Sequence, residues 1–261
     1  MLEALVALVA GLLIGSFLNV CIYRMPRDLS VVSPRSYCPA CEHPIAWYDN
    51  IPIASFAILR GRCRHCSKPI PLRYLLVEAL TAALFVVVAL VHGPTLASVV
   101  LCVFCALMVG LVFSDLEERI LPDEFTVGGI ALGLLFAYVA PFQVIFLGLL
   151  LPHWNHRWLS VAEAAVATAF PALLLWGVGA LYQKIRHKEG LGLGDVKMVA
   201  MIGAFLGLQA AVATVMVGSL LGSVIGLAYI HLTRKDASTY ELPFGSFLGA
   251  GAILVALIVK R

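Results

Sequence analysis

The chain has 261 residues, of which 61% are hydrophobic and 13% are charged, with a net charge of +3 and a mean hydropathy of +0.97. Soluble globular proteins are about half apolar and about a quarter charged, so this composition excludes an ordinary soluble domain. It indicates a polytopic membrane protein.

Apolar blocks of about 20 residues, the length that crosses a bilayer, recur along the chain. We therefore expect an all-α polytopic membrane protein with about eight transmembrane helices. The boundary near Gly207 is open, because one kinked or re-entrant segment would also fit the sixth and seventh blocks. Gly218, Gly222 and Gly226 have the spacing typical of close helix packing. The predicted spans are 2–22, 74–92, 95–114, 125–151, 159–182, 196–208, 210–231 and 244–259.

The basic residues are distributed very unevenly over the predicted loops. If the chain starts outside, the alternate loops 23–73, 115–124, 183–197 and 232–243 contain 15 of the 18 Lys and Arg residues. The positive-inside rule then predicts that these loops face the cytoplasm. Topology thus accounts for the positive charge, and we expect no nucleic-acid partner. The first span has no charged n-region and no obvious cleavage site, so we interpret it as an uncleaved helix.

Residues 23–73 form the one sizeable hydrophilic region, and they contain too few apolar residues to fold by hydrophobic burial alone. The region holds two C-x₂-C pairs, with 21 residues between them: Cys38, Cys41, Cys63 and Cys66. Four thiolates in two close pairs suit a structural, tetrahedral zinc ion. Two disulfides are the alternative, which the reducing conditions of the cytoplasm disfavour. We expect a small zinc-stapled domain between the first and second helices.

Two aspartates mark the predicted cytoplasmic ends of separate apolar helices. Asp195 lies in Gly190-Leu191-Gly192-Leu193-Gly194-Asp195-Val196-Lys197, where an ionisable group at the hydrocarbon boundary is costly enough to indicate function. Its three glycines allow a close approach of backbone or substrate. Asp115 follows the third apolar block on the same predicted face. Considered alone, Asp115 is most simply a solvated helix-end carboxylate, and Asp123 a favourable charge at the start of the next helix.

If Asp115 and Asp195 meet in the bundle, mutual repulsion and partial burial would leave one carboxylate ionised and the other protonated. The ionised group would take a proton from water while the protonated group polarises a peptide carbonyl, which is aspartic-protease chemistry. One alternative is a proton-coupled transporter that uses the same two carboxylates. It is disfavoured because both lie at one membrane face and no inverted repeat is evident. A zinc-stapled scaffold without chemistry is the third hypothesis.

A series of motifs in a fixed order makes the chain recognisable. Besides the two cysteine pairs they are Gly15-Ser16-Phe17-Leu18-Asn19-Val20, Asp49-Asn50-Ile51-Pro52, Arg60-Gly61-Arg62-Cys63, Arg73-Tyr74 with Val77-Glu78, Asp115 with Leu121-Pro122-Asp123, Gly192-Leu193-Gly194-Asp195-Val196-Lys197, and Pro243-Phe244-Gly245. Over nearly its whole length, the chain resembles the bacterial type IV prepilin peptidases, the leader peptidase/N-methyltransferases of type IV pilus and type II secretion systems.

The resemblance implies an intramembrane aspartic peptidase of the bacterial inner membrane. Such an enzyme cuts the basic leader of prepilins or pseudopilins after a glycine, at the cytoplasmic face, on substrates that enter from the lipid bilayer. It then methylates the new N-terminus with S-adenosylmethionine. Carried onto this chain, the catalytic pair is Asp115 and Asp195.

The resemblance also implies zinc ligands and a division of the chain. The zinc ligands would be Cys38, Cys41, Cys63 and Cys66. The parts would be a first transmembrane helix (1–22), a zinc-binding, methyltransferase-associated domain (23–73) and a transmembrane peptidase domain (74–261). For the methyl-donor site, the expected contributors are drawn from Asp49, Asn50, Arg73 and Glu78.

Overall fold

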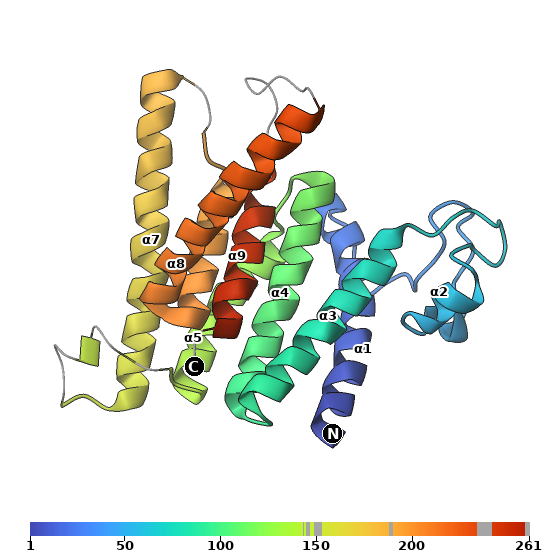
Figure 1. Ribbon diagram of the computed structural model, residues 1–261, viewed down its shortest axis with the longest axis horizontal. Coiled ribbons are helices and arrows are strands. Elements are labelled where there is room, and N and C mark those ends of the chain that lie inside the picture. Colours follow the sequence, from blue (N-terminus) through green and yellow to red (C-terminus); the bar gives the residue numbers. More distant parts are fainter. Residues whose placement is uncertain (143, 145–146, 149–152, 188–189, 234–241, 259–261) are drawn as a thin grey trace. The chain divides into compact units, whose positions relative to one another are not determined.

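The computed structural model describes residues 1–261 except 143, 145–146, 149–152, 188–189, 234–241 and 259–261. Within the described residues every regular element is a helix (Figure 1), which confirms the predicted all-α class. The elements are α1 (Leu2–Arg24), η1 (Met25–Arg27), η2 (Trp47–Asn50), α2 (Ala54–Ile58), α3 (Leu72–His92), α4 (Leu96–Glu118), α5 (Asp123–Val139), α7 (His156–Arg186), α8 (Leu193–Thr233) and α9 (Phe244–Ile258).

Five of the described helices are long and apolar enough to cross a membrane. They are α1 with its η1 extension, α3, α4, α7 and α8, while α9 is apolar but shorter. Each coincides with one or two of the blocks predicted from hydrophobicity. The structure therefore agrees with a chain built from membrane-spanning helices.

Several helix ends have a local cause in the sequence. Pro71 and Pro122 immediately precede α3 and α5, and both adopt the extended ψ of 137° that starts a helix. Proline has a fixed φ and no backbone N–H, so it is well tolerated just before or at the first turn. Asn155 precedes α7, and its side-chain oxygen accepts the backbone N–H of Arg157 at 3.0 Å. Such a cap satisfies one of the free amides of the first turn.

The long helix α8 is broken at Gly207, whose φ of 81° and ψ of 176° are not helical. The break falls at the boundary left open between the predicted spans 196–208 and 210–231. The predicted fourth span, 125–151, is longer than the helix found there. α5 ends at Val139, two residues before Pro141, and parts of 143–151 lie outside the described residues.

The described chain forms two compact units, of which the first is Met1–Phe113. In this unit α1 packs against α3. The contact is close because a Cβ on Gly11 would lie 2.6 Å from the Cα of Ala82, and one on Gly15 would lie 2.8 Å from the Cα of Glu78. The Asn19 side chain also donates to the carbonyl oxygen of Tyr74 at 3.1 Å. Small residues and interhelical hydrogen bonds are what associate helices in a bilayer.

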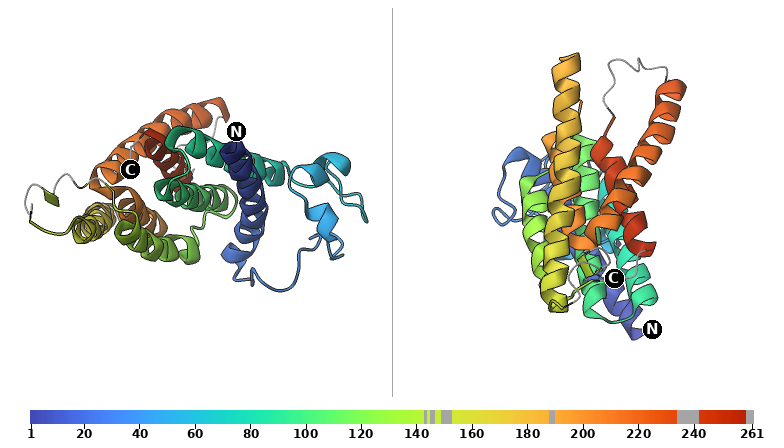
Figure 2. Two further views of the ribbon diagram at one scale, coloured as in Figure 1. Left: turned by 90° about the horizontal axis from the view of Figure 1, so that it is seen from below. Right: turned by 90° about the vertical axis from the view of Figure 1, so that its left-hand side faces the viewer.

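The second unit, Ser114–Arg261, is organised around α8. α8 packs against α5, α7 and α9, and Figure 2 shows α7 running alongside it. The first half of α8 provides much of the core, including Met198, Ile202 and Phe205, which are fully buried. Its second half uses glycine, since a Cβ on Gly218 would lie 2.9 Å from the Cα of Leu248 on α9. The predicted role of this glycine in close helix packing is confirmed.

Candidate active site and metal centre

Asp115 lies in the last turns of α4 and is buried, with 6% of its surface exposed. Its Oδ2 accepts two hydrogen bonds from Ser246, one from the backbone N–H and one from the hydroxyl, each at 2.7 Å. Ser246 belongs to the first turn of α9, where backbone amides have no partner within the helix. The start of α9 therefore fixes the orientation of the Asp115 carboxylate.

Close packing brings the start of α9 onto the end of α4. A Cβ added to Gly245 would lie 3.2 Å from Cγ of Asp115 and 3.1 Å from Cδ1 of Leu121. A Cβ on Gly194, just before Asp195, would also lie 3.1 Å from the side chain of Leu121. Leu121 thus packs against Gly245, which contacts Asp115, and against Gly194, which precedes Asp195.

Asp195 is in the first turn of α8 and is partly buried. Its own backbone N–H bonds to the carbonyl oxygen of Gly192 at 3.1 Å, and the backbone of Gly192 also hydrogen-bonds the Asp195 carboxylate. Gly194, the residue before Asp195, and Gly245, which faces Asp115, both pack against Leu121, and all of these residues lie in the second unit. The two residues singled out from the sequence thus belong to one unit and one site.

The glycines of this stretch serve packing. None of the three has a positive φ, and a Cβ on Gly190 would lie 2.5 Å from the Tyr182 ring. Gly192 differs, because a Cβ there would make only an ordinary contact of 3.5 Å with Oδ2 of Asp195. Gly190 and Gly194 therefore allow close packing of the side chains of Tyr182 and Leu121.

A surface ion pair lies beside this site. Lys197 Nζ contacts both carboxylate oxygens of Asp123, at 2.7 and 2.9 Å, and so ties the start of α5 to the second turn of α8. The two side chains are 40% and 63% exposed, and exposed pairs contribute little to stability. Asp123 does open a helix, as expected from the sequence, and its partner Lys197 was not foreseen.

The four cysteines predicted as metal ligands come together. The Sγ atoms of Cys38, Cys41, Cys63 and Cys66 all lie within 4.8 Å of one another, and those of Cys38 and Cys66 are 3.9 Å apart. Tetrahedral zinc with Zn–S bonds of about 2.3 Å needs sulfur atoms roughly 3.8 Å apart. The four thiols therefore fit a tetrahedral metal ion.

The two cysteine pairs sit in equivalent backbone turns, 25 positions apart along the chain. In the first, the N–H of Cys38 bonds to the oxygen of His43, and the N–H of Glu42 bonds to the oxygen of Cys38. In the second, the N–H of Cys63 bonds to the oxygen of Lys68 in the same way. A local repeat thus builds each half of the four-thiol cluster.

The backbone turns also prepare a thiolate. The backbone amides of Cys66 and His65 hydrogen-bond the Cys63 thiol and lower its pKa to about 7. At Cys41 the hydrogen bond from the backbone amide of His43 lowers the pKa. Desolvation and the neighbouring thiols outweigh it, and the net effect is a pKa raised to about 11. The thiolate is the form that binds metal, so a nearby cation favours deprotonation of the whole set.

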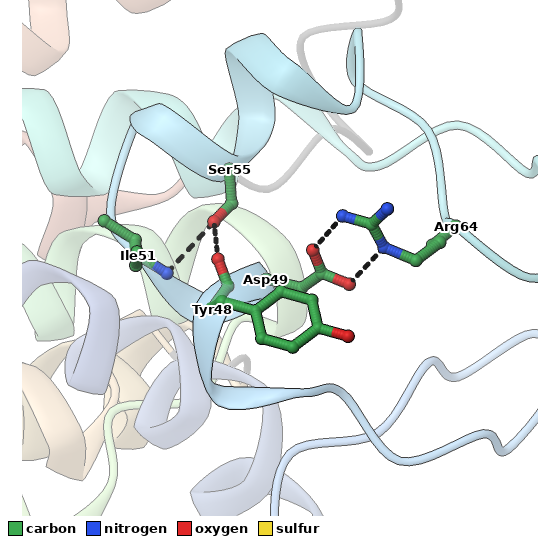
Figure 3. A network of polar contacts seen from close by, with 5 residues as sticks. All are labelled: Tyr48, Asp49, Ile51, Ser55 and Arg64. Carbon is green, nitrogen blue, oxygen red and sulfur yellow. Dashed lines mark hydrogen bonds and ion pairs between the residues drawn. The ribbon is translucent and has the colours of Figure 1, made fainter.

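A polar network joins the second cysteine pair to η2 (Figure 3). Arg64, which lies between Cys63 and Cys66, donates from Nε and Nη2 to the two carboxylate oxygens of Asp49, at 2.7 and 2.6 Å. The guanidinium lowers the pKa of Asp49 through these hydrogen bonds. Ser55 closes the other side, since its hydroxyl accepts the Ile51 N–H at 3.0 Å and donates to the Tyr48 oxygen at 2.9 Å.

Glu78 connects this small region to the helices. Its carboxylate is buried between α1 and α3, where it accepts the backbone N–H of Ile53 at 2.8 Å and a hydrogen bond from the side chain of Ser16. Ile53 has a φ of 60°, which is unusual for a β-branched residue and requires support from its surroundings. Asp49 and Glu78, both expected at the methyl-donor site, thus have partners within the fold.

Comparisons with known proteins give two family models that match successive parts of the chain. A family model described as the bacterial peptidase A24 N-terminal domain matches residues 9–92, and one described as the type IV leader peptidase family matches residues 102–227. No solved structure gives a significant match.

Curated relatives are similar over most of the chain. A prepilin leader peptidase/N-methyltransferase of Aeromonas hydrophila is 34% identical over 271 residues, covering 95% of this chain and 88% of the relative. The protein of the same name from Myxococcus xanthus is 38% identical over 240 residues, covering 92% of this chain and 67% of the relative. That from Klebsiella pneumoniae is 36% identical over 216 residues, covering 80% and 88%.

Proposed function

The chain belongs to the type IV leader peptidase family, and on this basis we propose that it cleaves prepilins or pseudopilins and methylates the product. The cut removes the basic leader after a glycine, and the methyl group goes to the new N-terminal amine. The observation that supports the peptidase half is that Leu121 packs against both Gly245, which contacts Asp115, and Gly194, which precedes Asp195, within one unit.

The chemistry proposed for the pair is direct attack by water on the scissile peptide. One carboxylate is ionised and accepts a proton from the attacking water, while the other is protonated and donates to the carbonyl oxygen. The tetrahedral intermediate then collapses with breakage of the C–N bond. The proton taken from water passes to the leaving amine, and the other carboxylate takes a proton back from a hydroxyl of the intermediate as the carbonyl re-forms. The pair thus returns to its starting state with one proton. No covalent intermediate is needed.

The ligands proposed for a structural zinc ion are Cys38, Cys41, Cys63 and Cys66. When bound there it would stabilise the fold, since four thiolates would complete its set of ligands and leave no position for substrate. The domain that it staples corresponds to the proposed division at residues 23–73. The remaining parts are the first helix, 1–22, and the peptidase domain, 74–261.

For methylation, S-adenosylmethionine supplies the methyl group when bound. Asp49 and Glu78, two of the expected contributors to the donor site, accept hydrogen bonds from Arg64 and from the Ile53 amide. We assign no residue to the donor site. The methyltransferase half of the proposal is supported by the names and coverage of the relatives.

The proposed location is the bacterial inner membrane, with about eight spans and the active site facing the cytoplasm. The concentration of 15 of 18 Lys and Arg residues in alternate loops supports this orientation. Eight spans would count the two parts of α8, on either side of Gly207, separately. A prepilin, with a basic leader before a long apolar helix, would then enter sideways from the bilayer.

The decisive experiment follows product mass when purified protein is mixed with a prepilin. Leader cleavage should be lost in both Asp115→Asn and Asp195→Asn while both variants keep the melting temperature of the wild type. Full cleavage by either variant would refute the proposed pair. Labelled S-adenosylmethionine in the wild-type assay tests the second activity, and an unlabelled mature N-terminus would refute it.

A further inference from the structure

The small region between α1 and α3 exposes large apolar side chains. Trp47 and Ile58 are each 73% exposed, Tyr48 is 50% exposed and Ile51 is 45% exposed. We call these four residues the η2–α2 apolar set. Single exposed apolar residues are ordinary, but two adjacent aromatics and two isoleucines within twelve positions form an unusual concentration.

These side chains project from a fixed turn. The Ser55 hydroxyl joins the two ends of the turn by bonding the Tyr48 oxygen and the Ile51 N–H, and Arg64 holds Asp49 by two hydrogen bonds (Figure 3). Because the backbone is tied on both sides, little order would have to be gained when the apolar set is covered.

The depth of the turn along α3 is also fixed. The N–H of Ile53 bonds to Oε2 of Glu78 at 2.8 Å, and Glu78 lies six residues after Leu72, the first residue of α3. Six residues of α-helix correspond to about 9 Å. α3 is a candidate membrane span, and Figure 1 shows α2 beside its first turns. The turn that precedes α2 is therefore held beside the first turns of α3 at Ile53, and Leu72 and Leu76 are themselves exposed in those turns.

The charges that follow the apolar set are of one sign. Arg60, Arg62 and Lys68 come within ten residues of Ile58 and are exposed, while Arg64 in the same stretch is paired with Asp49. Aromatic residues collect at the headgroup level of a bilayer, and basic residues near it are attracted to anionic lipids. Both features match one occupant, an anionic lipid surface.

We propose that the η2–α2 apolar set is inserted in the headgroup region of an anionic bilayer. The cysteine-stapled region then lies in the membrane surface, held beside α3, and does not project into water. This inference concerns lipid contact and goes beyond the proposed cleavage and methylation. Its test reads lipid contact directly, so its failure would leave the peptidase proposal standing.

The test uses a full-length variant in which Trp47 is the one tryptophan, made by Trp154→Phe, Trp158→Phe and Trp176→Phe. It is reconstituted in vesicles of phosphatidylcholine and phosphatidylglycerol. Lipid brominated near the headgroup should quench its emission more strongly than lipid brominated near the chain end, and acrylamide in the water should quench it weakly. A variant that retains Trp176 alone is the positive control, since Trp176 lies among exposed leucines on α7.

Two results would overturn the proposal. Strong quenching by acrylamide with none by brominated lipid would mean that the set projects into water. Protection from both quenchers would mean that protein, such as a second copy of this chain, covers it. If the triple variant does not fold, the difference in brominated-lipid quenching between wild type and Trp47→Phe gives the same information. No difference there would also refute lipid contact.

Discussion

The hydroxyl and the backbone amide of Ser246 both donate to Oδ2 of Asp115, each over 2.7 Å. An oxygen that accepts two donors is a poor place for a proton, so a proton shared by the pair belongs on Oδ1 of Asp115 or on Asp195. The contact also joins the first turn of α9 to the end of α4. Ser246 is in this sense a positioning residue for the proposed reaction.

Replacement of Ser246 by alanine should lower kcat about fivefold and leave KM unchanged. The variant loses one of two donors to Oδ2 and keeps the backbone amide, and one such hydrogen bond contributes about 1 kcal/mol. Ser246→Thr retains the hydroxyl and should restore most of kcat. Steady-state cleavage of a prepilin peptide measures both constants. Equal kcat for the serine, alanine and threonine forms would remove this role from Ser246.

Ser160→Ala is the matched control for that series. Ser160 on α7 is another buried serine of the second unit, and its hydroxyl accepts the Phe142 N–H at 3.3 Å. Its loss should lower the melting temperature without lowering kcat of the folded fraction. A fall in kcat as large as that of Ser246→Ala would mean that any buried hydroxyl has this effect.

Gly203→Ala should destabilise the second unit by about 1–3 kcal/mol, the usual cost of overpacking. A Cβ at Gly203 on α8 would overlap the carbonyl oxygen of Ala167 on α7. Gly128→Ala is the control, because a Cβ at that position of α5 would meet nothing within 4 Å. Thermal unfolding in detergent compares the two. Equal melting temperatures would show that α7 and α8 do not pack as closely as described.

Much of the fold can be predicted from the sequence because helix ends are encoded locally. Pro71, Pro122 and Asn155 each stand at a helix start, and Gly207 breaks α8 at the boundary between the predicted spans 196–208 and 210–231. Hydrophobicity does not predict the helix bounds where a helix extends beyond its apolar block. α7 runs from His156 to Arg186, beyond the predicted 159–182, because a helix continues past the hydrocarbon into its basic last turn.

The charged and cysteine residues of the candidate site could be predicted from the sequence, but the residues that hydrogen-bond to them could not. Asp195 and the paired cysteines are unusual for their surroundings, whereas Asp115 is singled out only through its pairing with Asp195. Ser246 is an ordinary serine, and its contact joins residues 131 positions apart. Only the break at Pro243-Phe244-Gly245 hinted that a helix start lies near the site. Likewise, the sequence around Arg64 does not indicate Asp49 as its partner, and the sequence around Glu78 does not indicate Ile53.

Glu78→Ala should destabilise the first unit by about 2 kcal/mol, whereas Glu78→Gln should cost less. The alanine variant leaves the Ile53 N–H without its acceptor, and a buried, unsatisfied donor costs about 1–3 kcal/mol. Glutamine keeps a carbonyl oxygen for that N–H, which holds Ile53 at its positive φ. Thermal unfolding of the two variants gives the order. A glutamine variant as unstable as alanine would show that the negative charge matters more than the accepting oxygen.

Metal removal should loosen η2 through Arg64, and a pair of variants separates the metal from its connection. Cys63→Ser should lose the bound metal and disorder the turn that carries Arg64, because metal binding and folding of such small domains are coupled. Arg64→Ala should keep the metal and break only the two hydrogen bonds to Asp49. Metal content by elemental analysis and the emission of Trp47 in the single-tryptophan chain report the two effects separately. We expect Arg64→Ala to keep its full metal content and to show a shifted Trp47 emission. We expect Cys63→Ser to lose the metal and to show the shifted emission as well. Unchanged metal content in Cys63→Ser would refute the four-cysteine site, since three thiols and one hydroxyl do not form the shell that the geometry fits.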